Sequence, residues 1–367
     1  MQDFNKVLNN EERAVYSLRA LYKDYGYTQY KMSKFEEYDL YVRNKDFLVS
    51  DSVITFTDTD GKLMALKPDV TLSIIKSNSN LESGIKKVFY NENVYRVSKG
   101  TRSYKEIMQV GLECQGDIDD YTITEVLLLA TESLKKISNE FVLDISHLGI
   151  ISAVADMLNI SESGRKKILT CLGEKNVEGI INICEQENAD NTGAKILTEL
   201  IGLYGKPETV IEKLKNIALP EKAIKAVEEL ENIIKELNVL GASENINIDF
   251  SVVNDMGYYN GIVFKGFING IPTGVLSGGQ YDLLMQKMGS SKGAIGFAVY
   301  LDSLGKLSEV KEEYDVHTVV LYSDKTKLSV INNAVIKAKS QGNSVLAVKE
   351  LPEKLRYKNL VELKGDK

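Results

Sequence analysis

The alternation of hydrophobic and polar positions first marks two amphipathic helices. Apolar residues recur at helical spacing over residues 10–25, and Gly26 then ends the pattern. A second helix is predicted over residues 120–139. The apolar positions are Ala14, Leu18, Leu21, Tyr22 and Tyr25 in the first helix, and Val126, Leu129, Ala130 and Leu134 in the second. Each stripe indicates a helix that packs one face against a core.

Between these helices, residues 38 to 110 have the pattern of strands broken by turns. A hairpin around Asp60-Gly61 is predicted by "SVITFTDTDGKLMALK", and a short helix by "DVTLSIIKSN". Two further strands are expected in "KKVFYNENVYRV" and "EIMQVGLECQG". Strands resume at "NINIDFSVV" and continue through "GYYNGIVFKGFINGIPTGVLSGG", where Asn269-Gly270 is typical of a type I′ hairpin turn. A strand that runs into a helix is predicted by "GAIGFAVYLDSLGKL".

The remaining stretches predict the domain organisation. Helical patterns follow one another over residues 146–240, most clearly in "PEKAIKAVEELENIIKELNVL", and lie between two strand-rich regions. We therefore expect a helical insertion, 146–240, in a core formed by residues 1–145 and 241–310. Residues 313–367 predict a small C-terminal unit with a strand, a helix and a strand, which is one βαβ-like element. The fold class is α+β.

Composition narrows the class of protein. The 367 residues carry a net charge of −7, with 43% hydrophobic and 26% charged residues, as in an ordinary soluble globular protein. No run approaches the roughly 20 apolar residues of a membrane span, and the N-terminus lacks the apolar segment of a secretory signal. The three cysteines are dispersed and fit neither a zinc spacing nor a disulfide framework. We expect a cytoplasmic protein without membrane contact, metal or cofactor.

Polar and aromatic residues with the chemistry of a ligand site recur near the predicted strands. They are Asp69 and Thr71 in "LKPDVT", Arg96, Gln109 and Glu113 in "VYRVSKGTRSYKEIMQVGLECQG", and Tyr258 and Tyr259 in "NDMGYYNG". Gln109 and Glu113 lie four residues apart on a strand and therefore face the same side. The adjacent tyrosines face opposite sides of a strand, so that one should pack into a core and the other elsewhere. The exposed face of a sheet would have the same pattern, so these residues alone leave a binding site open.

These pieces, followed by "SGGQYDLL" and "GAIGFAVYLDSL", have the order and spacing of a known family. Over roughly residues 4 to 310 the chain resembles histidyl-tRNA synthetase and its non-synthetase relative, the regulatory subunit of ATP phosphoribosyltransferase. The resemblance implies a class II aminoacyl-tRNA synthetase-like core, which is an antiparallel sheet flanked by helices, with a helical insertion after the motif 2 region. It also implies that the small α/β C-terminal unit is a truncated form of the synthetase's anticodon-binding domain.

Several positions depart from the synthetase pattern. Arginines are replaced by Asn254, Gln280 and Ser303, a glutamate by Ser98, an aspartate by Gly257, a glycine by Tyr300 and the motif 1 proline by Ser33. Amino-acid activation depends on cations that hold a bent triphosphate, and neither asparagine nor serine can replace the planar, charged fork of arginine. Tyr300 would also fill space where the family seats the nucleotide. We expect no catalytic residues and no adenylation.

By resemblance, a histidine-binding site is retained. Asp69, Thr71 and Gln109 would meet the α-amino group of free histidine, Glu113, Tyr258 and Tyr259 would meet its imidazole, and Arg96, which matches the motif 2 arginine, belongs to the same site. A carboxylate pairs with an ammonium group, and a second carboxylate accepts an imidazole N–H. Asp69 replaces the family's glutamate and is one methylene shorter.

The resemblance implies a non-catalytic regulatory subunit of ATP phosphoribosyltransferase. Its partner would be the short catalytic subunit, which joins ATP to phosphoribosyl pyrophosphate in the first step of histidine synthesis, and histidine would be a feedback effector. The chain would form a homodimer within a larger hetero-oligomer and would bind no tRNA. Two alternatives stay open, namely a diverged but active histidyl-tRNA synthetase and a stand-alone histidine sensor.

Overall fold

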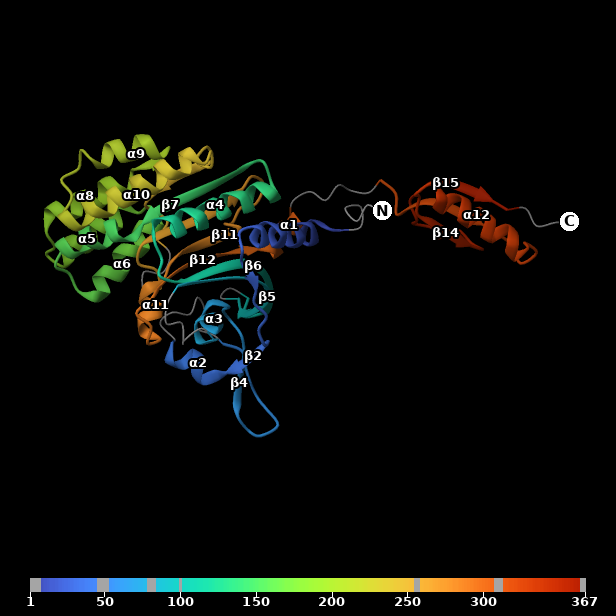
Figure 1. The fold of residues 1–367 in the computed structure, drawn as a ribbon, viewed down its shortest axis with the longest axis horizontal. Coiled ribbons are helices and arrows are strands. Elements are labelled where there is room, and N and C mark those ends of the chain that lie inside the picture. The colour runs from blue at the N-terminus through green and yellow to red at the C-terminus, as the bar shows by residue number, and fades with distance from the viewer. Residues whose placement is uncertain are drawn as a thin grey trace. The chain divides into compact units, whose positions relative to one another are not determined.

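The computed structural model of the chain describes residues 8–44, 53–77, 84–98, 101–253, 258–306 and 313–363. The chain divides into two compact units, Met1–Leu307 and Ser308–Lys367 (Figure 1). Strands and helices alternate irregularly along the first unit, as the α+β class requires. No helix in the described ranges is long and apolar enough to cross a membrane.

Within the described residues, a nine-stranded sheet forms the centre of the first unit. Its strands, in spatial order, are β1 (Thr28–Gln29), β5 (Ile85–Val97), β6 (Tyr104–Gly116), β12 (Gly293–Tyr300), β11 (Leu276–Gln280), β10 (Ile262–Ile268), β7 (Phe141–His147), β9 (Ile246–Asp249) and β8 (Tyr204–Gly205). The strands from β5 to β7 pair antiparallel, whereas β1 joins β5, and β9 joins β7, in parallel. The two strands predicted in the motif 2 region are β5 and β6, which pair over their whole length.

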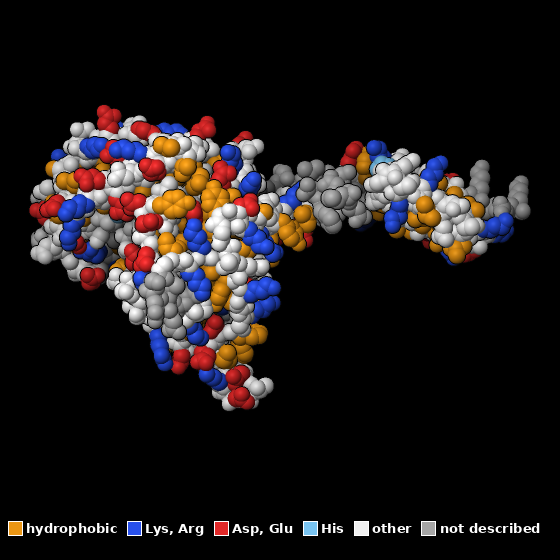
Figure 2. All heavy atoms as spheres, viewed as in Figure 1, with side chains coloured by type: hydrophobic (Ala, Val, Ile, Leu, Met, Phe, Trp, Pro, Cys, Tyr) orange, Lys and Arg blue, Asp and Glu red, His pale blue; other side chains and the backbone are white. Residues whose placement is uncertain are grey.

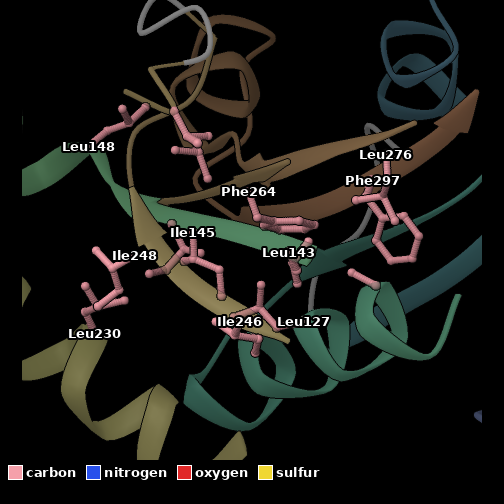
Figure 3. Packing of buried hydrophobic residues seen from close by; sticks show 14 of the residues in the cluster. Leu127, Leu143, Ile145, Leu148, Leu230, Ile246, Ile248, Phe264, Leu276 and Phe297 are labelled. Atoms are coloured by element: carbon pink, nitrogen blue, oxygen red, sulfur yellow. The ribbon is translucent and has the colours of Figure 1, made fainter. Parts of the chain in front are cut away.

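Helices α1 (Asn10–Asp24) and α4 (Asp120–Ile137) pack against one face of this sheet, near the positions that their apolar stripes predicted. Helix α1 begins in a capping box, because the Asn9 side chain accepts the Glu12 N–H and Glu12 accepts the Asn9 N–H. Figure 3 shows Leu143, Phe264 and Phe297 of the sheet gathered on the side that carries Leu127 of α4.

The predicted helical insertion contains α5 (Leu148–Met157), α6 (Glu162–Gly173), α7 (Val177–Gln186), α8 (Asn191–Ile201), α9 (Pro207–Leu214) and α10 (Glu221–Val239). Helix α10 packs on α5 and α4. His147 caps α5, since its Nδ1 accepts the Gly149 N–H at 3.1 Å, and its Nε2 lies 3.3 Å from the Glu229 carboxylate of α10. This histidine therefore has a structural position. These helices belong to the first compact unit together with the sheet. The insertion as a separate domain therefore stays a prediction.

The opposite face of the sheet carries smaller elements. They are α2 (Tyr38–Arg43), α3 (Thr71–Ser77), α11 (Asp282–Lys287) and a second sheet with the order β2 (Phe35–Glu37), β4 (Leu63–Leu66) and β3 (Thr55–Thr57). The predicted Asp60-Gly61 hairpin is the turn between β3 and β4. Residues 38–43 were expected as strand and are helical. Tyr38 and Tyr41, three residues apart, both pack in the cluster that contains Leu72 and Tyr281, so tertiary packing overrides the β propensity of this stretch.

The predicted type I′ turn at Asn269-Gly270 is wrong. Gly270 has a φ of 84°, but Asn269 is not among the residues with positive φ, and a type I′ turn needs both. The Asn269 N–H donates to the Glu140 carbonyl oxygen at 2.9 Å, and its Nδ2 donates to the Glu140 carboxylate at 2.6 Å. These bonds tie the turn to the residues that precede β7 and fix a different geometry.

The second unit contains β13 (Val316–Leu321), α12 (Leu328–Ser340), β14 (Val345–Val348) and β15 (Tyr357–Glu362). Its three strands are parallel in the order β14, β13, β15. The expected strand, helix and strand are present, and β15 is an additional strand that its half-polar sequence did not predict. Figure 2 shows hydrophobic side chains among charged ones at the surface of this unit.

Candidate functional site

Strand β6 divides its side chains between the two faces of the large sheet. Val110, Leu112 and Cys114 point into the hydrophobic core together with the buried side chains of α1 and α4. Gln109 and Glu113 therefore lie on the opposite face, because side chains alternate along a strand. Both are almost fully buried, at 3% and 2% exposure. Other elements must therefore pack on that opposite face and cover Gln109 and Glu113.

Small residues form the floor of the sheet around Glu113. In the register of the strands, Glu113 pairs with Gly296 of β12, which pairs with Gly279 of β11. A Cβ at Gly296 would overlap Glu113 Oε2, and a Cβ at Gly279 would lie 2.8 Å from Tyr259 Cδ1. The glycines therefore let a carboxylate and an aromatic ring lie directly against the sheet.

The Glu113 carboxylate is held from two sides. Thr71 Oγ1, at the start of α3, donates to Glu113 Oε1 at 2.7 Å. Tyr281 OH, just before α11, donates to Oε2 at 2.6 Å. Burial raises the pKa of Glu113 to about 8, and the hydrogen bonds from Tyr281 and Thr71 limit that rise. The carboxyl group is therefore poised to exchange a proton near neutral pH.

Asp69 and Arg96 lie at the start of α3. Asp69 Oδ1 accepts the Leu72 N–H at 3.0 Å and so caps this helix, while Arg96 Nε donates to the Pro68 carbonyl oxygen at 3.0 Å. Burial raises the pKa of Asp69, and the hydrogen bond from Leu72 and the charge of Arg96 oppose the rise. Asp69 therefore caps α3 and lies within the field of the Arg96 charge.

The expectation that the two adjacent tyrosines face opposite sides of a strand is wrong, because they precede β10 and their rings pack against each other with centroids 4.5 Å apart. Tyr258 is buried in the cluster with Tyr281, and the centroids of these two rings are 5.7 Å apart. Tyr259 is only partly buried and lies over Gly279. Asn260 fixes this segment, because its Nδ2 donates to Asp282 Oδ2 at 3.1 Å and its Oδ1 accepts the Asp282 N–H at 2.8 Å.

The structure thus brings all seven predicted site residues to one face of the sheet, where two of them also have structural contacts. Thr71 bonds to Glu113, and one oxygen of Asp69 caps α3, so both serve the architecture of the site. Gln109 lies opposite Tyr300 in the register of β6 and β12. We name Asp69, Thr71, Arg96, Gln109, Glu113, Tyr258, Tyr259 and Tyr281 the Glu113 cluster.

Sequence reasoning missed Tyr281 and Tyr90. Tyr281 is 168 residues from Glu113, so its hydrogen bond carries no local signal, although its place in "GGQYD" could have marked it. Tyr90 lies over Gly111, and the nearby carboxyl groups of Glu113 and Asp69 add to the effect of burial in raising its pKa. A tyrosine in the middle of the apolar strand β5 looks like an ordinary core residue.

Two of the positions that depart from the synthetase pattern accept backbone hydrogen bonds. Gln280 Oε1 accepts the Ile262 N–H at 2.7 Å, and Ser33 Oγ accepts the Phe35 N–H at 3.0 Å. Ser303 lies in the 3₁₀ helix η3 (Leu301–Lys306). Asn254 and Gly257 lie outside the described residues. In the described ranges, no group of three or more metal-ligating side chains is placed to hold a metal ion.

We expect Gly296→Ala to lower the free energy of unfolding by about 1–3 kcal/mol, because the new Cβ overlaps both the Glu113 carboxylate and the Leu112 carbonyl oxygen. Urea unfolding followed by circular dichroism measures the change. Gly305→Ala is the matched control, since its Cβ would meet no atom closer than 3.6 Å. Equal midpoints for both variants would show that Glu113 does not lie against the strand.

Comparison with known proteins identifies the fold. The family model described as histidyl-tRNA synthetase matches residues 5–304. An ATP phosphoribosyltransferase regulatory subunit from Caldanaerobacter subterraneus is 31% identical over 289 residues, which cover 77% of this chain and 75% of the relative. A crystal structure of an ATP phosphoribosyltransferase regulatory subunit/histidyl-tRNA synthetase from Bacillus halodurans matches with a TM-score of 0.79 at 23% identity, over 96% of this chain and 93% of that one.

An ATP phosphoribosyl transferase complex from Thermotoga maritima also contains a similar chain, with a TM-score of 0.63 and 20% identity over 82% of this chain and 97% of that one. The sheet and the Glu113 cluster upon it define a class II synthetase-like protein. The chain belongs to the histidyl-tRNA synthetase family, among the ATP phosphoribosyltransferase regulatory subunits. The resemblance found in the sequence and the predicted fold class are confirmed.

Proposed function

We propose that this chain is the non-catalytic regulatory subunit of ATP phosphoribosyltransferase. It is required for the activity of a separate, short catalytic subunit and for feedback regulation by histidine in the first step of histidine biosynthesis. The names of the curated relatives and the Thermotoga maritima complex support this function. The observation that carries it is a buried carboxylate site that remains while arginines of the synthetase pattern are replaced by Asn254, Gln280 and Ser303.

The replaced arginine positions explain why the synthetase reaction is lost. The side-chain oxygen of Gln280 is bonded to the backbone of β10, and Ser303 is a short uncharged side chain. Tyr300 lies near Arg96, whose charge partly offsets the rise that burial causes in the pKa of Tyr300. A phenol beside the retained motif 2 arginine takes space that a nucleotide would need. Neither a phenol nor an amide supplies the fixed positive charge of a guanidinium group.

The Glu113 cluster has the chemistry to bind free histidine. Glu113 accepts or donates a proton at an imidazole nitrogen, and Tyr259 offers an aromatic wall beside it. The Asp69 carboxylate and the Gln109 amide have the chemistry to meet the ligand's α-amino group, and Arg96 supplies a positive charge for the α-carboxylate. We infer that histidine bound here is the feedback effector, and the coupling between such sites is typically about 1–3 kcal/mol.

A homodimer within the hetero-oligomer completes the proposal. The small sheet in the motif 1 region exposes Phe35 and Phe56, whose rings meet edge to face with centroids 5.3 Å apart. An exposed aromatic pair on the short strands β2 and β3 is suited to an interface between subunits. This supports pairing of the core through the motif 1 region.

Reconstitution with the short catalytic subunit tests the function. We expect the two proteins to copurify, and formation of phosphoribosyl-ATP from ATP and phosphoribosyl pyrophosphate to require both and to fall when histidine is added. Full activity of the catalytic subunit alone would contradict the proposal. Histidine binding without copurification would instead favour the stand-alone sensor.

A further inference from the structure

Strand β15 is an edge of the sheet in the second unit, and its outer side has no partner strand among the described residues. The Leu363 N–H, directly after β15, donates to the Leu321 carbonyl oxygen of β13 at 2.8 Å. Because backbone groups alternate sides along a strand, the N–H and C=O groups of Lys358, Leu360 and Glu362 point away from β13. An unpaired edge of this kind is a template for another strand.

The side chains of this edge are also available. Leu360 and Val361 are 38% and 39% exposed, and Lys358 and Glu362 are exposed. Neither Lys358 nor Glu362 forms an ion pair with any residue that the structure describes. The strand contains no proline, which is one of the usual devices that block an edge.

Two side chains of opposite charge, Lys358 and Glu362, each lie two residues from Leu360. If β15 pairs antiparallel with β15 of a second copy about a two-fold axis at Leu360, the two Leu360 residues lie opposite each other. Lys358 then lies opposite Glu362 of the second copy, and the same contact repeats on the other side of the axis. All of these positions have outward backbone groups, so each is a hydrogen-bonded pair of the antiparallel ladder. Opposite charges directly across such a ladder stabilise it.

We propose that β15 is a self-association strand, through which two copies of this chain join their C-terminal units into one continuous six-stranded sheet. The contact is isologous, as a two-fold interface requires. The other edge strand, β14, has the uncharged sequence Val345–Val348 and half-buried side chains, so no charge pair sets a register there. The β15 pairing is distinct from the proposed pairing of the cores.

The small size of this edge sets its strength. Six residues bury far less surface than the roughly 1,200–2,000 Å² of a stable interface, so β15 alone gives a weak contact. In an assembly that already holds two copies, the local concentration raises its occupancy. A cross-link detects even weak pairing. The test uses only the chain itself, so its outcome does not depend on the proposed function.

The test places a single cysteine on β15 of the full chain. In a hydrogen-bonded pair the Cα atoms are ~5.5 Å apart, within the range of a disulfide. Leu360→Cys should therefore give a disulfide-linked dimer on mild oxidation, seen on a non-reducing gel. Lys358→Cys is the matched control, because two copies of residue 358 are offset by about 13 Å along the paired strands. The unchanged chain controls for its own three cysteines.

Charge exchange supplies the second arm of the test. In the Leu360→Cys background, Glu362→Lys places two lysines opposite each other and should reduce the cross-linked fraction several-fold. Adding Lys358→Glu restores opposite charges and should restore the cross-link, and high salt should weaken both effects. No cross-link in Leu360→Cys, or equal cross-linking of Leu360→Cys and Lys358→Cys, would overturn the proposal. A cross-link to the catalytic subunit in place of the dimer would also overturn it.

Discussion

Histidine-dependent exchange of pyrophosphate into ATP should stay at background when the chain is purified alone. One preorganised donor to the transition state is commonly worth about 10²–10³ in rate, and the chain has asparagine and serine where the family has two arginines. Even with strong non-additivity, the loss of both removes most of the catalysis. Gln280, bonded to the backbone of β10, supplies no replacement charge.

The measurement uses labelled pyrophosphate, ATP and histidine, with an active histidyl-tRNA synthetase as the positive control. The Asn254→Arg/Ser303→Arg double variant tests whether the chain lacks exchange activity because it lacks these two guanidinium groups. Some exchange in that variant and none in the unchanged chain would support the chemical argument. Exchange by the unchanged chain at an ordinary enzymatic rate would instead establish the alternative of a diverged synthetase.

Most of the core fold could be predicted because its signals are local. Helices α1, α4 and α10 have clear amphipathic stripes, and the long strands β5 and β6 have strong β propensity on both sides of a short loop. Their positions in the structure agree with the pattern, since one apolar face is enough to specify each element. The alternation along β6 also placed Gln109 and Glu113 on one face before any tertiary contact was known.

The failures come from contacts that a local pattern cannot encode. Residues 38–43 are helical because Tyr41 packs against distant side chains, and Asn269 avoids the left-handed region because it bonds to Glu140. Strand β15 lacks an apolar run because both its side chains and its outer edge are exposed. The same limit applies to the site, where the roles of Thr71 and Tyr281 follow from hydrogen bonds across the sheet.

Glu113→Gln should weaken histidine binding by about 1–3 kcal/mol, or roughly 5- to 150-fold in Kd. The amide keeps the shape of the side chain, but it cannot take the negative charge that pairs with an imidazolium. Isothermal titration calorimetry measures the change. Glu106→Gln, the same substitution at an exposed position of β6, is the matched control and should bind histidine like the unchanged chain. Unchanged affinity in Glu113→Gln would remove Glu113 from the ligand site.

The fold of the variant can be checked through the pH dependence of stability. Burial raises the pKa of Glu113 from 4.5 to about 8, so the folded state holds a proton that the unfolded state has lost between these values. The stabilising effect is complete below pH 4.5 and is lost as the pH rises towards 8. The free energy of unfolding of the unchanged chain should therefore fall by a few kcal/mol, on the order of what such a shift implies, as the pH rises over this range. Glu113→Gln should lack this fall and be the more stable protein at pH 8.

The same shift predicts the pH profile of binding. Between pH 6.5 and 8 the Glu113 carboxyl group of the unbound protein is protonated and the imidazole of free histidine is neutral. Together they hold one titratable proton, which is the number that a carboxylate–imidazolium pair contains. Binding then needs no net proton, and the affinity should be level. Above pH 8 the complex must take up a proton, so the affinity should fall about tenfold per pH unit, and below pH 6.5 it should fall because a proton must be released. The ligand's α-amino group titrates alike with both proteins, so the difference between the profiles of the unchanged chain and Glu113→Gln isolates Glu113. Identical profiles would mean that histidine binds without contact to this carboxyl group.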